Sequence, residues 1–592
     1  MENGGIIMIS LPCEAVEGYK TPNKTKRSNQ MKFNDMPYAR PDIEGLKARL
    51  NRLKEKIENA NSADEIISAY REVGKVSEEY STLGSLAYVR HTINTEDEFY
   101  DAENNFFDEV GPTVTDAFQE INKALLSSPF RKEIDAHFGE LLLKNTEISV
   151  RCFSSQIIEM AAEENRLQSE YQKLIASARV EWEGQTIPLP MLGKYKQSAD
   201  REVRKKAFLK DAEFFDSHKE ELDTLYDKLI KLRNKQARTL GYENFIQMGY
   251  DRLGRNCYGP KEVAAFRQEI KENIVPVVSE LKKAQAARIG VDSLHLYDND
   301  VMFPEGNVSP KGSSDELLWA AIDMYKEMSE ETAEFISFMQ ENELYDLLSS
   351  EGKAPGGYCT EFSAYKAPFI FSNFNGTSGD VDVLTHEAGH AFAYFVAARK
   401  GLIPDYISPT IEACEIHSMS MEFLTAPWHE RFFGEDTNKY EYYHAADALN
   451  FIPYGCMVDE FQHLMYENED LTPDQRNKIW LGLEEKYRPH LELSDLPFYS
   501  RGGGWQRQLH IYLYPLYYID YCMAQTVAFQ FYAESLKDWK KAFKKYLAFV
   551  DGGGSKTFEE LVKGADMNLP YDKGCLKQTA EIIKEQLNSY GF

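Results

Sequence analysis

The N-terminal part of the chain shows the apolar spacing of amphipathic helices. Between residues 42 and about 177, apolar side chains recur every three or four positions with charged residues between them, as in Leu46, Leu50, Leu53 and Ile57. That spacing gathers apolar side chains on one helix face, which packs against a neighbour. No strict heptad persists over three or four repeats. We therefore expect one wall of a large helical protein rather than a partner-binding coiled coil.

Val180–Gly193 interrupts this pattern. The segment holds two prolines and two glycines, which is typical of a small hairpin or a linker, and we place a domain boundary there. The sequence thus predicts an N-terminal helical domain over residues 31–190 and a second domain over residues 191–592. Residues 1–30 are small and polar with a few basic positions, and we expect them to form a flexible tail.

Helical patterning resumes beyond this boundary and is broken by one strand-like segment. The helical stretches are Arg201–Gly241, Lys261–Arg288 and Asp315–Ser349. After them, Pro368–Phe374 combines aromatic and β-branched residues between glycines and is the best strand candidate. The chain is therefore predicted to be mostly α, with a small β-sheet.

Charge and composition narrow the range of functions. The 592 residues carry 67 Lys+Arg against 95 Asp+Glu, a formal net charge of −28. Nucleic-acid binders need a basic stripe and none is visible, so we expect no nucleic-acid partner. The eight cysteines are scattered without a C-x-x-C pair, which is typical of reduced thiols. A signal peptide and a membrane-spanning run of roughly 18–20 apolar residues are both absent, so we expect a cytoplasmic protein with no membrane partner.

The segment DVLTHEAGHAFAYF contains the motif H-E-x-x-H, formed by His386, Glu387 and His390. Two histidines four positions apart on a helix lie about 40° apart around its axis, so both imidazoles can reach one metal ion. Glu387 points to much the same side and is the predicted general base for a metal-bound water. Zinc suits this role because it lowers the pKa of bound water to about 7 and polarises a carbonyl group. We therefore predict one Zn2+ per chain.

A third ligand should come from the next acid-bearing helical segment, PTIEACEIHSMSMEFL. A metzincin would place a histidine six residues after His390, but that position is Val396, so this class is excluded. The segment offers Glu412, Glu415 and Glu422, and one of these carboxylates would complete a His2Glu site with a position left for water. Spacing alone does not choose among them.

HEAGH followed by E-I-H-S-M-S-M-E resembles the thimet oligopeptidase and oligoendopeptidase F family of zinc metallopeptidases. The family's E-x-x-S-x-x-x-E element matches Glu415, Ser418 and Glu422, and the resemblance makes Glu415 the third ligand. Downstream, Y-Y-I-D-Y-x-x-A-Q is similar to the bacterial Pz-peptidase-like branch of oligoendopeptidases. The resemblance implies a large helical zincin-type fold with a small β-sheet beside the active site, two helical halves around a deep substrate channel, and a catalytic domain over residues 191–592.

The resemblance also implies substrate-binding residues. The segment PFIFSNFNGTSGD is similar to the family's edge strand, which leads through a loop into the zinc helix. In relatives that strand lies beside the bound peptide, so Phe371–Gly376, with Asn375 and Gly376 at its end, is expected to offer backbone hydrogen bonds.

A further segment, GGGWQRQLHIYLYPLYYIDY, matches the family's histidine followed by tyrosines. It implies that His510 and Tyr517 donate hydrogen bonds to the oxyanion of the transition state, with Tyr514 and Tyr518 as substrate-binding residues that could replace them. The preceding Gly502–Gly504 fits either a mobile loop that closes over a peptide or a simple tight turn.

Carboxylates near the ligands are candidates for orienting them. Asp382 lies one turn before His386, and Glu412 lies one turn before Glu415. Ligand histidines usually donate their second N–H to such a group. Each acid could equally well be a solvent-exposed residue at the start of its helix. Asp380 is an alternative to Asp382 for the orienting role.

Together these patterns predict a zinc-dependent endopeptidase that hydrolyses internal bonds of oligopeptides. A dipeptidyl carboxypeptidase on a related helical zinc fold is the alternative. It would need a cation for the free C-terminus of its substrate, and Arg501 or Arg507 could supply it. A non-catalytic binding protein is disfavoured because the complete set of catalytic residue types is present.

Overall fold

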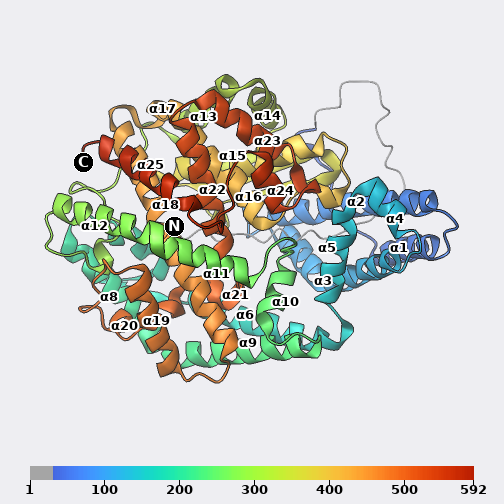
Figure 1. Ribbon diagram of the computed structural model, residues 1–592, viewed down its shortest axis with the longest axis horizontal. Helices are drawn as coiled ribbons and strands as arrows, with labels where there is room; N and C mark the ends of the chain where they lie inside the picture. The colour runs from blue at the N-terminus through green and yellow to red at the C-terminus, as the bar shows by residue number, and fades with distance from the viewer. Residues whose placement is uncertain (1–30) are drawn as a thin grey trace. The chain divides into compact units, whose positions relative to one another are not determined.

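The computed structural model describes residues 31–592, so the flexible tail predicted for residues 1–30 lies outside the described residues. Helices dominate and strands are few, which confirms the mostly α prediction (Figure 1). Contacts divide the chain into two compact units, each built from separated stretches of sequence. Unit 1 contains residues 31–150, Ser309–Gly434 and Glu534–Asp566, and unit 2 contains Arg151–Val308, Glu435–Ala533 and Met567–Phe592. Neither unit ends at residue 190, and the boundary there stays a prediction.

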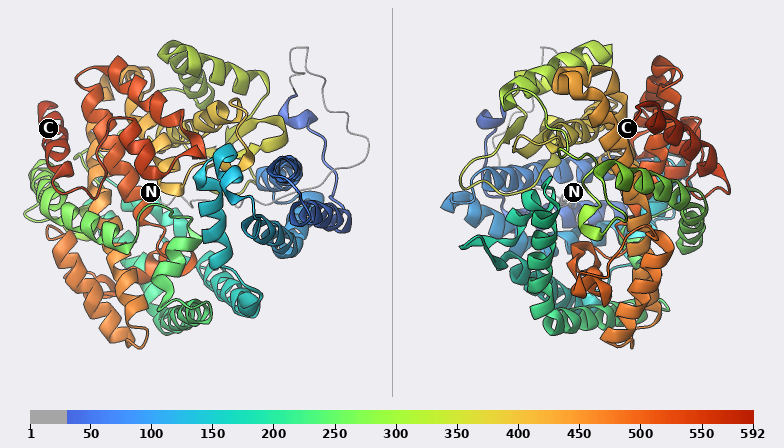
Figure 2. Two further views of the ribbon diagram at one scale, coloured as in Figure 1. Left: turned by 45° about the vertical axis from the view of Figure 1, so that its right-hand side comes forward. Right: turned by 90° about the vertical axis from the view of Figure 1, so that its left-hand side faces the viewer.

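Unit 1 begins with long amphipathic helices that pack side by side (Figure 2). Asp42 and Ser62 cap the first two of them, because each side chain accepts a hydrogen bond from a backbone N–H that the helix leaves unpaired. The four apolar side chains noted above for the first helix are all buried. They share one hydrophobic core with side chains of the next two helices. The helices of unit 1 are α1 (Ile43–Glu58), α2 (Ala63–Ile93), α3 (Glu98–Leu126), α4 (Arg131–Phe138), α5 (Glu140–Arg151), α13 (Ser314–Met328), α14 (Glu330–Glu341), α15 (Gly379–Ala398), α16 (Ile411–Leu424), α17 (Glu430–Phe433), α23 (Trp539–Val550) and α24 (Phe558–Gly564).

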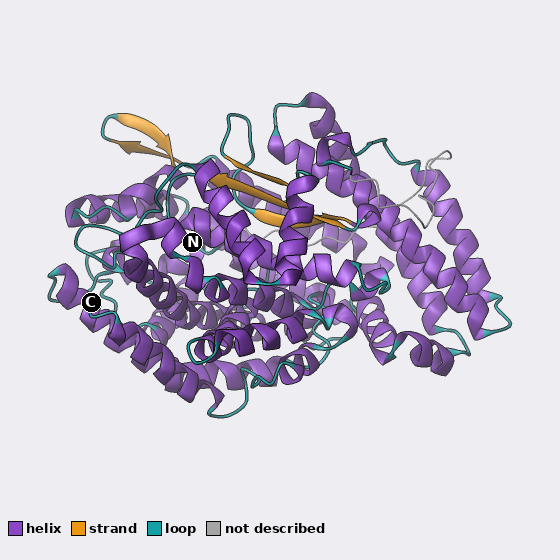
Figure 3. Cartoon of the chain, turned by 90° about the horizontal axis from the view of Figure 1, so that it is seen from above, coloured by secondary structure: helices purple, strands orange, loops and turns teal. Residues whose placement is uncertain are grey.

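A three-stranded sheet in unit 1 packs against α15. Its strands, drawn in orange in Figure 3, lie in the order β3-β5-β4. β5 confirms the predicted strand, but the expectation that Phe371–Gly376 forms an edge strand is wrong. Phe371 is paired with Asp346 on one side and with Tyr358 on the other, which makes β5 central. The bounds are β3 (Tyr345–Leu348), β4 (Tyr358–Phe362) and β5 (Ala367–Phe374).

The helical prediction for Asp315–Ser349 is wrong for the last part of that segment, because its residues pair with β5. Its first part forms α13 and α14, but Tyr345 pairs in parallel with Ile370, which is far away in the sequence. Pairing with a buried central strand overrides the local spacing of a segment as short as β3.

Unit 2 is also helical and carries one isolated hairpin. The hairpin confirms the interruption predicted at Val180–Gly193, and its turn residues Glu183 and Gly184 both have positive φ, of 50° and 81°, as a two-residue hairpin turn requires. The predicted helical stretches after it are confirmed by α8 with α9 and by α11 with α12. The elements are α6 (Ile158–Ala176), β1 (Arg179–Trp182), β2 (Gln185–Pro188), α7 (Gly193–Lys196), α8 (Arg201–Ser217), α9 (Lys219–Thr239), α10 (Phe245–Arg252), α11 (Pro260–Glu269), α12 (Val275–Ile289), α18 (Thr437–Glu467), α19 (Pro473–Tyr487), α20 (Pro497–Ser500), α21 (Leu509–Leu513), α22 (Ile519–Ser535) and α25 (Cys575–Ser589). None of the helices among the described residues has the length and apolar character needed to span a membrane.

Candidate active site

Two helices of unit 1, α15 and α16, cross closely at the predicted metal site. Gly389 lies at the crossing, where an added Cβ atom would lie 2.6 Å from Ser418 Cα and 2.7 Å from the carbonyl oxygen of His417. Because backbone occupies that space, only glycine permits so close an approach. The glycine of HEAGH therefore sets the distance between the helix that carries the histidines and the helix that carries the glutamates.

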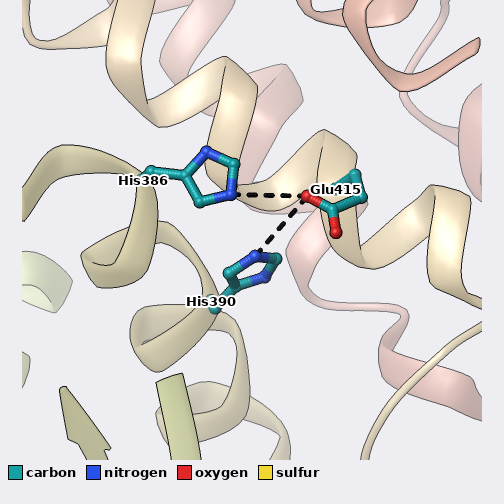
Figure 4. A group of neighbouring side chains, drawn as sticks. All are labelled: His386, His390 and Glu415. Atoms are coloured by element: carbon teal, nitrogen blue, oxygen red, sulfur yellow. Dashed lines mark ion pairs between the residues drawn. The ribbon is translucent and has the colours of Figure 1, made fainter. Parts of the chain in front are cut away.

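His386, His390 and Glu415 form one group of donor atoms (Figure 4). Glu415 Oε2 lies 3.4 Å from His386 Nε2 and 3.7 Å from His390 Nε2. A tetrahedral zinc ion about 2.0–2.1 Å from each ligand separates its ligand atoms by roughly 3.4 Å. Imidazole nitrogen and carboxylate oxygen are also the ligand types that zinc accepts. The spacing and the chemistry of this donor set therefore fit one zinc ion.

Glu387 lies between the two histidines in the sequence of α15, and its carboxylate reaches the sheet. The side chain is buried, and this burial raises its pKa to about 7, while His386 opposes the shift and Glu415 adds to it. The backbone of Cys359 in β4 donates a hydrogen bond to the carboxylate. A carboxyl group with a pKa near neutrality, held beside a predicted metal-ligand group, is suited to accept and return a proton.

The loop before α15 is tied to the helix through Asp380. Its carboxylate accepts hydrogen bonds from the backbone N–H groups of Asn375, at 2.9 Å, and Gly376, at 2.7 Å. A carboxylate in the first turn of a helix is also favoured by the helix dipole. These two N–H groups are therefore engaged within the protein, and the substrate-binding role of Asn375 and Gly376 stays a prediction.

The predicted oxyanion donors lie together in unit 2, around α21 and the start of α22. The ring of His510 has its centroid 4.6 Å from that of Tyr518, 5.8 Å from that of Tyr514 and 6.1 Å from that of Tyr517. The hydroxyl of Tyr517 donates to that of Tyr521 at 3.0 Å. Burial lowers the pKa of His510 to about 4, so its ring is neutral at neutral pH.

A strained residue turns the chain between these tyrosines. Leu516 has a φ of 64°, a left-handed conformation that costs a non-glycine residue about 1–2 kcal/mol. Its carbonyl accepts a hydrogen bond from Arg255 Nη2 at 2.6 Å, and its N–H donates to Gln462 Oε1 at 3.0 Å. The sequence analysis missed Leu516, Arg255 and Gln462, because no residue type at these positions signals a positive φ.

The three glycines before Trp505 are tightly packed. A Cβ atom added to Gly502 would lie 2.2 Å from the carbonyl oxygen of Asn477, and one added to Gly503 would lie 2.7 Å from the ring of Phe498. Gly502 also has a φ of 88°, which a side chain rarely adopts. Of the two alternatives for this segment, the structure favours the tight turn.

The chain matches two known protein-family domains. Residues 194–581 match peptidase family M3, and residues 33–153 match the peptidase M3 N-terminal domain. The chain belongs to peptidase family M3. This membership confirms the resemblance stated above and shows a metallopeptidase that hydrolyses peptide bonds.

Relatives of this M3 peptidase are similar along most of their length. Oligopeptidase PepF of Bacillus subtilis (strain 168) is 24% identical over 563 residues, which cover 89% of this chain and 81% of the relative. The oligoendopeptidase F homolog of Borreliella burgdorferi is 24% identical over 77% of this chain and 79% of its own. The structure of PZ peptidase A with inhibitor 2 is 46% identical, has a TM-score of 0.88, and is matched over 94% of this chain and 99% of that one.

One of the predicted ligand histidines is oriented by Glu422, which the sequence analysis considered only as a candidate ligand. Glu422 Oε1 lies 2.7 Å from His386 Nδ1, which keeps the proton on Nδ1 and turns the Nε2 lone pair toward Glu415. Glu422 follows Glu415 by seven residues, two helical turns, so both lie on the same face of α16. That spacing is the signal from which the role of Glu422 could have been predicted.

The supporting roles expected for Asp382 and Glu412 stay predictions. Asp382 lies in the first turn of α15. Glu412 is buried in the first turn of α16, and Thr410 Oγ1 donates to its carboxylate at 2.7 Å.

Proposed function

We propose that this M3 peptidase is a zinc-dependent endopeptidase that cleaves internal bonds of short oligopeptides. The observation that carries the proposal is the group of His386, His390 and Glu415 with Glu387 beside it. Three such ligands hold zinc and leave a fourth position for water. When bound, zinc would lower the pKa of that water to about 7 and polarise the scissile carbonyl group.

The chain's own residues then move the protons. Glu387 takes the proton of the attacking water and later delivers it to the leaving amine, and a pKa near 7 suits both transfers at neutral pH. Glu422 keeps His386 in the tautomer whose Nε2 is free to bind metal. His510 donates a hydrogen bond to the oxyanion that forms on the carbonyl, and Tyr517 does the same when its hydroxyl turns away from Tyr521.

The outer edge of β4 is the binding edge we propose for the substrate backbone. Ile370 donates its N–H to the carbonyl of Leu344, on the side of β3, so its pairing with Cys359 is a non-hydrogen-bonded pair of the antiparallel ladder. Such pairs alternate with hydrogen-bonded ones, so Cys359 and Glu361 both direct their N–H and C=O groups away from β5. The hydrogen bond from Cys359 to Glu387 agrees with this orientation. An extended peptide could therefore pair with Glu361 beside the catalytic carboxylate.

The ion pairs of the two candidate anchor residues favour the endopeptidase over the dipeptidyl carboxypeptidase. Arg501 lies 2.7 Å from Asp216, and Arg507 lies 2.6 Å from Asp211. A guanidinium that is already paired with a carboxylate is a poor anchor for the C-terminal carboxylate of a substrate.

The test is cleavage of a short, internally quenched peptide that is blocked at both ends, with zinc content measured alongside. We expect wild type to cleave it at an internal bond, Glu387→Ala to bind zinc without cleaving, and the exposed control Glu430→Ala to behave as wild type. Cleavage only of peptides with a free C-terminus would indicate the exopeptidase. Absence of bound zinc would overturn the proposed site.

A further inference from the structure

Gln508 lies between a tyrosine hydroxyl and the ring of His510 in unit 2. The hydroxyl of Tyr454, on α18, donates to Gln508 Oε1 at 2.7 Å. On the other side, Gln508 Nε2 lies 2.8 Å from His510 Nδ1. The hydroxyl of Tyr518 also hydrogen-bonds to the Gln508 side chain. The amide is therefore held at both ends.

With the amide oxygen of Gln508 on Tyr454 and its nitrogen on His510, the direction of each hydrogen bond follows. An amide oxygen only accepts and an amide nitrogen only donates. Because Tyr454 donates to the oxygen, the nitrogen faces the ring, and His510 Nδ1 must accept with its lone pair. A neutral imidazole that accepts at Nδ1 carries its proton on Nε2.

The proton on His510 Nε2 has no acceptor within the described part of the chain. The ring is only 5% exposed, so an unused donor there carries the full cost of its desolvation. The groups whose rings face His510 are Tyr514, Tyr517, Tyr518 and Tyr521. Such a buried donor is explained if an oxygen atom of a bound ligand accepts its hydrogen bond.

We propose that Gln508, held by Tyr454, fixes His510 as the Nε2–H tautomer, so that the ring presents a neutral N–H donor to the carbonyl oxygen of the substrate. Gln508 and Tyr454 are thus positioning residues that act through His510. The inference rests on the proposed function for the identity of the ligand, while the tautomer itself follows from the contacts alone.

The neutrality of the ring has a physical cause. Burial alone lowers the pKa of His510 to about 4, and the side chains that face it are tyrosines rather than carboxylates. A neutral imidazole can then donate to the developing oxyanion without itself losing a proton, which is the pattern of a preorganised neutral donor.

Two substitutions at Gln508 separate this role from a structural one. In Gln508→Glu the carboxylate only accepts, so it draws the proton of His510 to Nδ1 and leaves a lone pair on Nε2 facing the substrate. We expect kcat to fall about 100-fold with KM nearly unchanged, the loss typical of one oxyanion donor. Gln508→Met imposes neither tautomer, and we expect a smaller loss in kcat. Gln197→Glu adds the same charge at an exposed position of unit 2 and should match wild type.

Nitrogen NMR of the full-length protein with 15N-labelled histidine reads the tautomer directly, with His510→Gln identifying its signals. We expect a protonated Nε2 and an unprotonated Nδ1 in wild type, and a protonated Nδ1 in Gln508→Glu. A wild-type ring protonated on Nδ1, or wild-type kcat in Gln508→Glu, would overturn the proposal. A zinc-loaded wild type that cleaves no peptide would instead overturn the proposed function, and the spectrum would still decide the tautomer.

Discussion

The proposed zinc-ligand group and the His510 cluster are assembled by different means. His386, Glu387 and His390 share one helix, and a close helix crossing at Gly389 brings Glu415 to them. The His510 cluster depends instead on a corner of the chain at a residue with positive φ, held by side chains from distant segments. Helical spacing makes the two histidines and Glu387 visible in the sequence, and the family resemblance selects Glu415. The His510 cluster requires contacts that no local pattern contains.

The largest effect is expected at the proposed zinc-ligand group. Glu415→Gln replaces a carboxylate ligand with a neutral amide, which zinc binds poorly. We expect bound zinc to be lost at low free zinc and kcat/KM to fall at least about 1,000-fold, because the activated water is lost with the metal. Zinc content after dialysis and peptide cleavage measure the two effects. Full zinc content in this variant would show that Glu415 is not a ligand.

His510→Gln should affect catalysis without affecting zinc. We expect kcat/KM to fall about 100–1,000-fold, the usual loss for one oxyanion donor, while zinc affinity stays at the wild-type level. The pKa of His510 is about 4, so the ring is already neutral well below neutral pH. The residual activity of the variant should therefore fall at the same acidic pH as the activity of wild type. If an imidazolium were the donor, wild-type activity would instead rise as the pH falls toward 4.

Gly389→Ala tests whether the helix crossing sets the metal geometry. The new Cβ atom must push against the backbone of α16, which displaces Glu415 from the histidines. We expect a loss of zinc affinity of about 10–100-fold, as when the support of a ligand is removed, measured by competition with a chelator. Gly564→Ala is the matched control in the same unit, because nothing lies within 4 Å of its added Cβ atom. Equal zinc affinity in both variants would contradict the role of Gly389.

Glu361→Pro probes the outer edge of β4. Proline removes the N–H that points away from β5, and it leaves the ladder hydrogen bonds in place. Loss of one backbone hydrogen bond to the substrate should raise KM about tenfold. Glu361→Ala keeps the N–H and should show a much smaller change. Equal KM values in the two variants would exclude β4 as the binding edge.

Residues whose role follows from helical spacing could be predicted from the sequence. The helical stretches and the convergence of His386 and His390 belong to this class. The strand at Pro368–Phe374 follows from its aromatic and β-branched residues instead, and Glu415 is selected by the family resemblance. Helical spacing also applies to Glu422, since its seven-residue spacing from Glu415 places both on one helix face.

The remaining features depend on contacts between distant segments. The pairing of Tyr345 with Ile370 makes β5 a central strand, although the residues around Tyr345 have helical spacing. The conformation of Leu516 depends on Arg255, and the tautomer of His510 depends on Tyr454 through Gln508. Tertiary packing brings these partners together, and a short segment of the sequence does not reveal it.

The most direct test of the account is a crystal structure of the zinc-loaded protein with a phosphinic peptide, measured at the zinc absorption edge. We predict one anomalous peak, coordinated by His386 Nε2, His390 Nε2 and Glu415. We also predict a phosphinyl oxygen that accepts hydrogen bonds from His510 Nε2 and the Tyr517 hydroxyl. A peak elsewhere, or a phosphinyl oxygen that contacts neither side chain, would contradict the account.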